Sequence, residues 1–175
     1  AGDSSRLGAE LMLESELGGG LSTHVALTLL KARFDTAFRS CAPLAAFCNP
    51  VTGANTAVVP AGNRVPGVPN ATFFADLAYR NPALGLRGAF EVIANGAVAV
   101  NDFNSAYAPG YTIANLWAGL EQTAGRWRFR EFARVNNLFS REYIGAVIVG
   151  DANGRYYAPA PTRNFLFGAS AAYEF

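Results

Sequence analysis

The last thirteen residues of the chain alternate with a period of two between apolar positions and positions that are small or polar. A β-strand places successive side chains on opposite faces, so this pattern suits a strand with hydrocarbon on one side and water on the other. Leu166 is the one large apolar residue on the polar side. An amphipathic edge strand of a soluble β-sandwich is the alternative. The apolar side carries aromatic residues at both ends, namely Phe175, Tyr173, Ala171, Ala169, Phe167 and Phe165.

The composition of the whole chain agrees with many such strands. Hydrophobic residues make up 51% of the 175 residues and charged residues only 15%, against roughly 25% in a typical soluble domain. No apolar run approaches the roughly 20 residues that a membrane-spanning helix needs. Low charge is natural for a β-barrel, whose lipid-facing positions avoid it. The net charge of +1 and the lack of a basic run argue against nucleic acid as a partner.

Seven segments show the alternation, and none shows a sustained helical period. The connectors between them are alternately short and long, which is typical of bacterial outer-membrane barrels with tight periplasmic turns and long outer loops. We therefore predict an all-β, antiparallel, up-and-down transmembrane β-barrel segment whose last strand runs toward the periplasm. The long connectors are residues 35–70, 96–109 and 139–162. The seven segments are residues 4–17, 21–34, 71–80, 86–95, 110–120, 127–138 and 163–175.

Cys41 and Cys48 are the only cysteines, and they lie in an irregular stretch of the first long connector. A short-loop disulfide fits this spacing and indicates an oxidising compartment. The spacing is wrong for zinc, and His24 is the only histidine. The sequence therefore predicts neither a metal site nor a cofactor. It also shows no combination of nucleophile, base and acid, so we do not expect an enzyme.

Motifs in three stretches go beyond periodicity. They are residues 62–70, residues 108–112, and the pair 135–143 and 151–165. In the last of these, Asn-Leu-Phe is followed by a loop and then by Tyr157-Ala-Pro-Ala-Pro161-Thr-Arg163-Asn-Phe165. Together these motifs resemble the C-terminal β-barrel portion of a TonB-dependent outer-membrane receptor of the siderophore type. The terminal pair Tyr173 and Phe175 resembles the C-terminal assembly signature of such barrels. The resemblance covers essentially the whole chain.

The resemblance implies that residues 1–175 are the C-terminal part of a single 22-stranded barrel domain whose plug domain lies outside this sequence. It implies TonB-dependent uptake of a ferric siderophore or similar iron chelate across the bacterial outer membrane. The implied partners are the chelate, the TonB complex through the missing N-terminal region, outer-membrane lipid and the barrel assembly machinery. The alternatives are a complete small outer-membrane barrel acting as a pore, adhesin or enzyme, and a soluble lipocalin-like carrier.

Charged residues gather on one face of the segments, which we interpret as the lumen side. Pairing with the plug or with one another is favoured over direct ligand contact, and His24 is interpreted as a polar residue satisfied by its neighbours or by water. Glu131 falls on the opposite, apolar face, where either a β-bulge turns it inward or it lies near the membrane interface. The charged lumen residues are Glu10, Glu14, Glu16, Arg128, Arg130 and Arg134.

Ligand contact is expected in the long loops, because loops on a rigid barrel carry recognition. An arginine or tyrosine there suits an anionic iron chelate. For each candidate taken singly, a role as turn former or as girdle aromatic is the favoured alternative. The candidates are Asp102, Asn104 and Tyr107 in the second loop and Asp151, Asn153, Arg155 and Tyr156 in the third.

Overall fold

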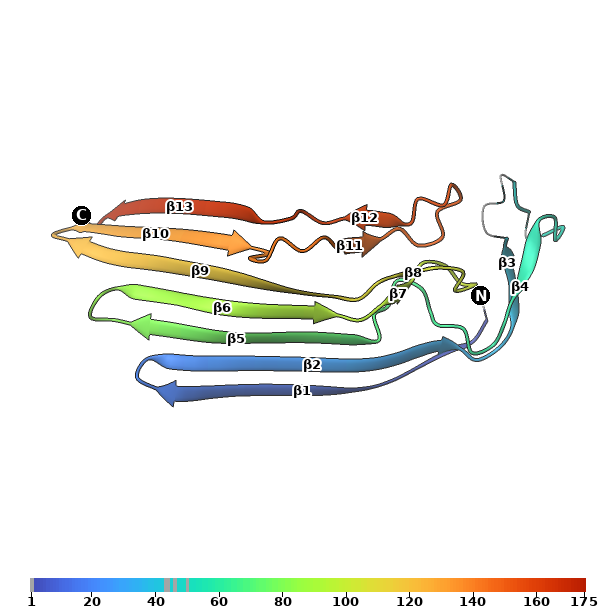
Figure 1. Cartoon of the computed structure of the whole chain (residues 1–175), viewed down its shortest axis with the longest axis horizontal. Coiled ribbons are helices and arrows are strands. Elements are labelled where there is room, and N and C mark those ends of the chain that lie inside the picture. The colour runs from blue at the N-terminus through green and yellow to red at the C-terminus, as the bar shows by residue number, and fades with distance from the viewer. Residues whose placement is uncertain (1, 43–44, 46, 50) are drawn as a thin grey trace.

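Seven long strands form one antiparallel sheet in the order β1-β2-β5-β6-β9-β10-β13 (Figure 1). The computed structural model describes residues 2–42, 45, 47–49 and 51–175. Within these residues no helix is long and apolar enough to cross a membrane. The predicted all-β, antiparallel, up-and-down arrangement is confirmed. The long strands are β1 (Ser4–Gly18), β2 (Leu21–Phe34), β5 (Ala71–Asn81), β6 (Leu86–Asn95), β9 (Tyr111–Ala124), β10 (Trp127–Asn136) and β13 (Asn164–Tyr173).

The ends of β9 and β10 differ from the predicted bounds for reasons that the backbone shows, and β13 ends at Tyr173 rather than at residue 175. β9 continues to Ala124, because Gly125 at φ +62° turns the chain and leaves only residues 125–126 between the strands. The predicted turn over residues 121–126 was therefore too long. β10 stops at Asn136 rather than at residue 138, because Asn137 adopts the left-handed conformation at φ +51°.

The three short turns and the C-terminus lie at one end of the sheet, and the long loops lie at the other (Figure 1). Each turn is joined by one backbone hydrogen bond to the strand that lies next to its hairpin, or to the residue that follows that strand. The turn glycines are held close to the neighbouring strand, since a Cβ on Gly20 would lie 2.2 Å from the carbonyl oxygen of Arg80. Only glycine fits such an approach. The three bonds are Arg80 N to Gly20 O at 2.8 Å, Glu121 N to Gly85 O at 2.8 Å, and Glu174 N to Arg126 O at 2.9 Å.

The long loops contain three small two-stranded sheets that the sequence analysis did not predict. Their strands are two to four residues long, which is too short to show a period of two. These sheets give each loop a defined hairpin rather than an irregular path. The pairs are β3 (Phe38–Cys41) with β4 (Thr56–Val59), β7 (Val98–Ala99) with β8 (Tyr107–Ala108), and β11 (Ile144–Val147) with β12 (Tyr157–Pro159).

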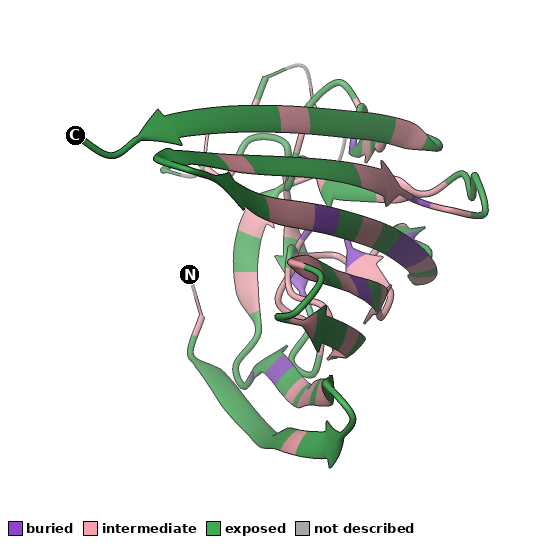
Figure 2. Ribbon diagram, turned by 90° about the vertical axis from the view of Figure 1, so that its left-hand side faces the viewer, coloured by how far each residue is buried: buried purple, intermediate pink, exposed green. Residues whose placement is uncertain are grey.

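The strand register separates the sheet into an apolar face and a polar face. On the apolar face, Leu27 lies opposite Leu11 on one side and Phe73 on the other. On the polar face, Glu91 lies opposite Asp76 and Asn115. The predicted alternation is therefore seen in the register of these strands, although Phe74, Trp117 and Phe132 are large apolar residues on the polar face. Both faces of the outer strands are largely exposed, and the sheet is curved (Figure 2).

Glu131 lies on the apolar face, opposite Leu120 in β9 and Ala169 in β13. The register of β10 is continuous with both neighbours. The interpretation that a β-bulge turns this carboxylate inward is therefore wrong, because a bulge would interrupt the register.

The tightest packing lies at the loop end of the molecule rather than within the sheet. The largest fully buried side chains are Val59, Val100 and Asn137. Val59 ends β4, Val100 follows β7, and Asn137 follows β10. The loops are therefore an ordered layer that positions the residues described next.

Candidate functional site

The three long loops are bonded to one another and form a single cluster. Loop 1 is residues 35–70, loop 2 is residues 96–110 and loop 3 is residues 137–163. Loop 2 lies between the others, because its carbonyl oxygens on Ala99 and Val100 accept hydrogen bonds from the amides of Gly67 and Gly150, both at 3.0 Å. We call this arrangement the loop cluster.

A hollow of about 310 Å³ opens within the loop cluster, and all three loops line it. The disulfide between Cys41 and Cys48 forms part of its wall. Both cysteines belong to loop 1, so the bridge closes a small ring within that loop. The other lining residues are Ser40, Ala42, Ala45, Asn101, Asp102, Phe103, Val149, Gly150, Asp151, Ala152 and Tyr156.

The hollow carries negative charge. Asp102 and Asp151 line it, and no arginine or lysine is among its described lining residues. The Asp102 carboxylate accepts a hydrogen bond from the Ser40 hydroxyl at 3.4 Å. The Asp151 carboxylate accepts one from the backbone amide of Asn153 at 2.6 Å. This lining suits ligand groups that donate hydrogen bonds or carry positive charge, rather than a bare anion.

Asn101 and Tyr156 join loops 2 and 3 at the wall of the hollow. The Asn101 side-chain amide donates to the hydroxyls of Ser105 at 2.7 Å and Tyr156 at 3.5 Å. Both Asn101 and Tyr156 are buried, so Tyr156 lies between the loops and not in an exposed aromatic girdle. Sequence reasoning missed Asn101, although an asparagine followed by Asp102 is a turn signal that marks loop geometry.

Asn104 and Tyr107 form a clasp with Arg64 of loop 1. The Asn104 side chain accepts from the Arg64 backbone amide at 2.8 Å and donates to the Arg64 carbonyl at 2.9 Å. The Tyr107 hydroxyl donates to Asn104 at 3.1 Å, and the Arg64 guanidinium lies 5.6 Å above the Tyr107 ring. In this structure the two predicted ligand residues hold loop 1 against loop 2. Arg64 was not a sequence candidate.

The structure therefore separates the seven loop candidates into three groups. Asp102, Asp151 and Tyr156 come together around the hollow. Asn104 and Tyr107 belong to the clasp. The remaining two lie outside the hollow: Asn153 is part of the turn that Asp151 closes, and Arg155 is exposed. Ligand contact by any of the seven stays a prediction.

A network of polar side chains crosses the polar face just below loop 3. The Arg134 guanidinium donates to both carboxylate oxygens of Glu91, with Nη1 3.0 Å from Oε1. The Asn115 side-chain amide donates to the same carboxylate at 3.2 Å. The Asn115 carbonyl oxygen in turn accepts from the backbone amide of Asn137 at 2.9 Å. β6, β9 and β10 are thereby connected to the first residue of loop 3.

Other charged groups of the polar face also pair within the sheet. His24 Nδ1 lies 3.0 Å from Asp76 Oδ1, which confirms that this histidine is satisfied by a neighbour. Arg130 pairs with Glu121 at 3.3 Å, and Arg128 pairs with Glu174. The predicted pairing of wall charges with one another thus occurs for all three arginines of β10.

Asn137 anchors loop 3 with its side chain. Its carbonyl oxygen accepts from the Arg141 amide at 2.9 Å, and its amide group donates to the Arg141 carbonyl at 2.7 Å. Nearby, the Tyr143 ring lies against Tyr111, with centroids 4.2 Å apart. Partial burial raises the pKa of the Tyr143 hydroxyl, and Tyr111 adds a smaller effect in the same direction. This phenol therefore remains a hydrogen-bond donor at neutral pH.

Aromatic residues gather at the opposite, turn end of the sheet. The Tyr173 ring packs edge-on against Trp127 at 5.1 Å and against Phe175 at 5.2 Å between centroids. Trp127 also stacks on Phe129 at 6.0 Å. Among the described residues, no group of three His, Cys, Asp or Glu side chains is placed to hold a metal ion.

No protein-family model matches the chain. Solved structures of iron-chelate receptors share its fold. The siderophore receptor PiuA from Acinetobacter baumannii superposes with a TM-score of 0.72 at 18% identity, over 96% of this chain and 22% of the receptor. The ferric yersiniabactin uptake receptor FyuA from Yersinia pestis gives 0.68 at 20% identity, over 100% of this chain and 24% of the receptor.

The ferric-catecholate import receptor Fiu from Escherichia coli K12, in its closed form, gives a TM-score of 0.63 at 18% identity, over 95% of this chain and 20% of the receptor. The chain thus spans between a fifth and a quarter of the length of these receptors. At these identities the likeness establishes the fold: an up-and-down sheet of the kind that forms part of a siderophore-receptor barrel.

Proposed function

We propose that this chain, whose fold is that of a barrel portion of siderophore receptors, supplies wall and three loops to an outer-membrane receptor that takes up a ferric siderophore or similar iron chelate. The observation that carries the proposal is the two-faced sheet with tight turns at one end and interlocked loops at the other. Such a sheet needs hydrocarbon against its apolar face and solvent against its polar face. In this orientation the loop cluster is extracellular and the aromatic residues Trp127, Tyr173 and Phe175 lie at the periplasmic interface.

The free edges of the sheet support a larger barrel. In the described chain β1 and β13 each pair with one long strand only. Unpaired backbone groups at such an edge are costly in lipid. We therefore propose that residues 1–175 belong to one 22-stranded barrel domain, and that further strands and a plug domain come from the rest of the receptor. Tyr173 and Phe175 would then present the assembly signature to the barrel assembly machinery.

The proposed transport cycle involves no covalent chemistry in this chain. The extracellular loops and the plug bind the iron chelate, TonB displaces the plug through its N-terminal region, and the ligand then passes along the polar face. Asp102, Asp151 and Tyr156 would contact donor groups on the organic part of the chelate, because their oxygens accept hydrogen bonds. The Arg134 and Glu91 pair keeps the wall polar without leaving a free charge in the ligand path.

The test is uptake of iron by the bacterium that carries the gene. The gene is deleted, and uptake of ⁵⁵Fe complexed to a catecholate, to yersiniabactin and to a pyoverdine is measured separately. We expect uptake of at least one complex to fall to background and to return with the wild-type gene. A strain that retains full uptake of every complex would refute the proposed function, as would recovery of the protein in the soluble fraction without detergent.

The hollow is tested in the same strain by Asp102→Asn combined with Asp151→Asn. Because a hydrogen bond to a charged group contributes about 1.5–3 kcal/mol, we expect the affinity for the transported complex to fall at least about 10-fold. Glu142→Gln is a control that removes one charge, and it is compared with each of Asp102→Asn and Asp151→Asn made singly, since Glu142 is an exposed acid of loop 3 outside the hollow. If the control lowers the affinity for the transported complex as much as the replacements in the hollow do, the proposal that the hollow contacts the ligand is wrong.

A further inference from the structure

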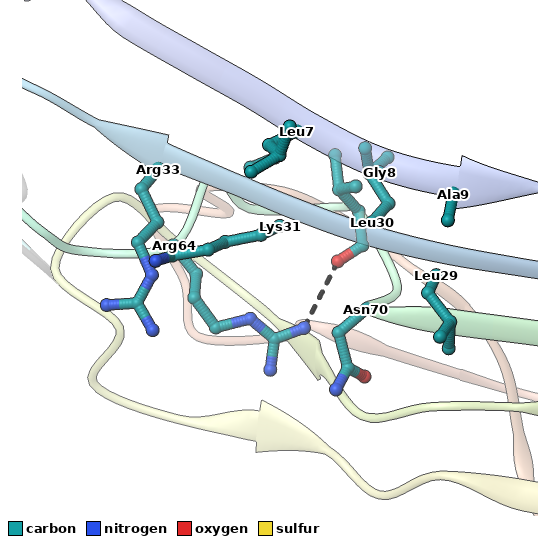
Figure 3. A pocket seen from close by; sticks show the side chains of 11 residues that line it. Leu7, Gly8, Ala9, Leu29, Leu30, Lys31, Arg33, Arg64 and Asn70 are labelled. Atoms are coloured by element: carbon teal, nitrogen blue, oxygen red, sulfur yellow. Dashed lines mark hydrogen bonds between the residues drawn. The ribbon is translucent and has the colours of Figure 1, made fainter.

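A second hollow of about 430 Å³ lies at the loop end of β1 and β2, and three basic residues line it (Figure 3). β2 contributes Lys31 and Arg33, and loop 1 contributes Arg64. Lys31 lies opposite Leu7 in the sheet, and the backbones of Arg33 and Arg64 form an isolated antiparallel β-bridge. Lys31 and Arg33 belong to the same face as Leu7 and Leu29, at its loop end, and Arg64 is paired with Arg33 from loop 1. Gly8, Leu30 and Ala32, whose positions belong to the opposite face, also line the hollow.

These positive charges are not neutralised within the described part of the chain. No salt bridge there involves Lys31, Arg33 or Arg64. The two guanidinium groups are positioned by backbone carbonyls, with Arg33 Nη1 2.8 Å from the oxygen of Gly62 and Arg64 Nη2 2.7 Å from that of Ala97. Each guanidinium has five N–H groups, so donors remain to bind an anion.

The described lining of this hollow contains no acidic residue. Asp35 follows the end of β2, two residues beyond Arg33, and its carboxylate accepts a hydrogen bond from the Ser5 hydroxyl at 2.7 Å. Asp35 is not among the lining residues. The hollow is therefore cationic, in contrast to the hollow of the loop cluster.

An apolar stripe runs from these cations along the same face toward the turn end. It consists of Leu11 and Leu13 in β1 and their partners Leu27 and Val25 in β2, followed by Leu29 next to the hollow. Leu11 is 60% exposed and Leu13 54% exposed. Cations at one end of an exposed apolar stripe match a molecule with an anionic head and hydrocarbon tails.

We propose that this hollow binds the phosphate of an anionic lipid whose acyl chains lie along the stripe. The inference rests on the proposed function, since it requires the apolar face to meet lipid. Arginine forks and the lysine ammonium are the groups that recognise phosphate, and basic residues at a membrane surface attract anionic lipids. A soluble phosphate would engage the cations alone, whereas a lipid also covers the five residues of the stripe.

The test uses the whole receptor purified from outer membranes in mild detergent. Binding of lipid A, a glycolipid with two phosphates, is measured by native mass spectrometry for wild type and for Lys31→Gln combined with Arg33→Gln. Arg64 is left in place because it holds the loops. Since each basic residue contributes roughly a factor of five, we expect about 30-fold weaker binding. Lys31→Arg is expected to bind as wild type does.

The matched control is Arg39→Gln combined with Arg155→Gln, which removes the same charge from loop residues outside both hollows. An equal loss in this control would mean that net charge alone attracts the lipid and would overturn the proposal. Equal affinity for neutral phosphatidylcholine would also overturn it, as would complete displacement of lipid A by millimolar inorganic phosphate. Unchanged heat-modifiable migration on a gel verifies that each variant is folded.

A second readout locates the lipid. Lys31 is the only lysine of the chain, so an amine-reactive reagent modifies one identifiable side chain within it. We expect lipid A, but not phosphatidylcholine, to protect the Lys31 peptide. Iron uptake by the Lys31→Gln and Arg33→Gln variant separates the two proposals. If this variant loses lipid binding but still takes up iron, the lipid site is supported and is separate from transport. If the wild-type receptor binds lipid A but takes up none of the iron complexes, the lipid site is supported and the proposed transport function is refuted.

Discussion

Asn137 combines a strained backbone with a buried, fully used side chain, and both can be tested by replacement. It is 2% exposed and adopts φ +51°. Its side chain makes two short hydrogen bonds to the backbone of Arg141 and a longer one, 3.4 Å, to the carbonyl of Pro161. Asn137→Ala removes these bonds and places a residue with a Cβ, but without the local bonding of asparagine, in the left-handed region.

The cost follows from these contacts. Each of the two short bonds contributes about 1 kcal/mol, and the left-handed conformation costs alanine about 1 kcal/mol more than asparagine. We therefore expect Asn137→Ala to lower the free energy of local opening of loop 3 by about 3 kcal/mol. Asn137→Gly loses the same bonds without the Cβ strain, so its cost is about 2 kcal/mol.

Hydrogen exchange at the Ala160 amide measures this opening, because this amide donates to the Tyr143 carbonyl at 3.1 Å within loop 3 and both variants keep that bond. Since about 1.4 kcal/mol is a factor of ten, exchange should accelerate about 140-fold in Asn137→Ala and about 30-fold in Asn137→Gly. Urea unfolding in lipid vesicles, followed by the fluorescence of Trp117 and Trp127, reports on the sheet as a control. Equal rates in the two variants would refute the backbone argument, and wild-type rates in both would show that the side chain does not hold the loop.

Three further predictions concern other parts of the wall and loops. Serine in place of both Cys41 and Cys48 should speed protease cleavage of loop 1, through a local loss of roughly 2–3 kcal/mol, while the urea midpoint of the sheet stays unchanged. Gly168→Val should lower the free energy of unfolding by about 2 kcal/mol, because a Cβ on Gly168 would lie 2.2 Å from the Phe132 ring. The urea midpoint should fall accordingly, and adding Phe132→Ala should recover part of the loss. Glu131→Leu should raise the free energy of unfolding by about 1 kcal/mol, and with it the urea midpoint, since it removes a carboxylate from the apolar face. A lower midpoint would show that this carboxylate has a partner in the complete barrel.

The long strands can be predicted because apolar and polar residues alternate with a period of two over about ten residues of each strand. β2 and β6 have the bounds that the alternation predicts. The end of β9 could not be found in this way, because Glu121, Gln122 and Thr123 are polar on both faces and look like a turn. In the structure these residues continue β9 and pair with β10, where Thr123 lies opposite Arg128 and Glu121 lies opposite Arg130 at the turn end of the sheet.

The arrangement of the loops could not be predicted from the chain. Their contacts join residues that are far apart in sequence, such as Asn63 with the Asp102 carbonyl and Arg64 with Asn104. Many of these contacts use backbone carbonyls, which every residue has, so the residue type gives no indication of them. The sequence therefore identified Asp102 as a candidate ligand contact in a loop but not as part of the wall of a hollow.

The bonds between the turns and the next hairpins have a consequence for how such a protein can change over time. Each turn fixes the offset between neighbouring hairpins to a single residue, as with Gly20 and Arg80. One inserted or deleted residue there would turn a whole strand over and present its charges to hydrocarbon. The opposite end has no such restriction, because long surface loops tolerate insertion at small entropic cost. Length variation is therefore confined to the loop end of the sheet, where it leaves the strand registers unchanged; under the proposed function this is the end where new ligand specificities would arise.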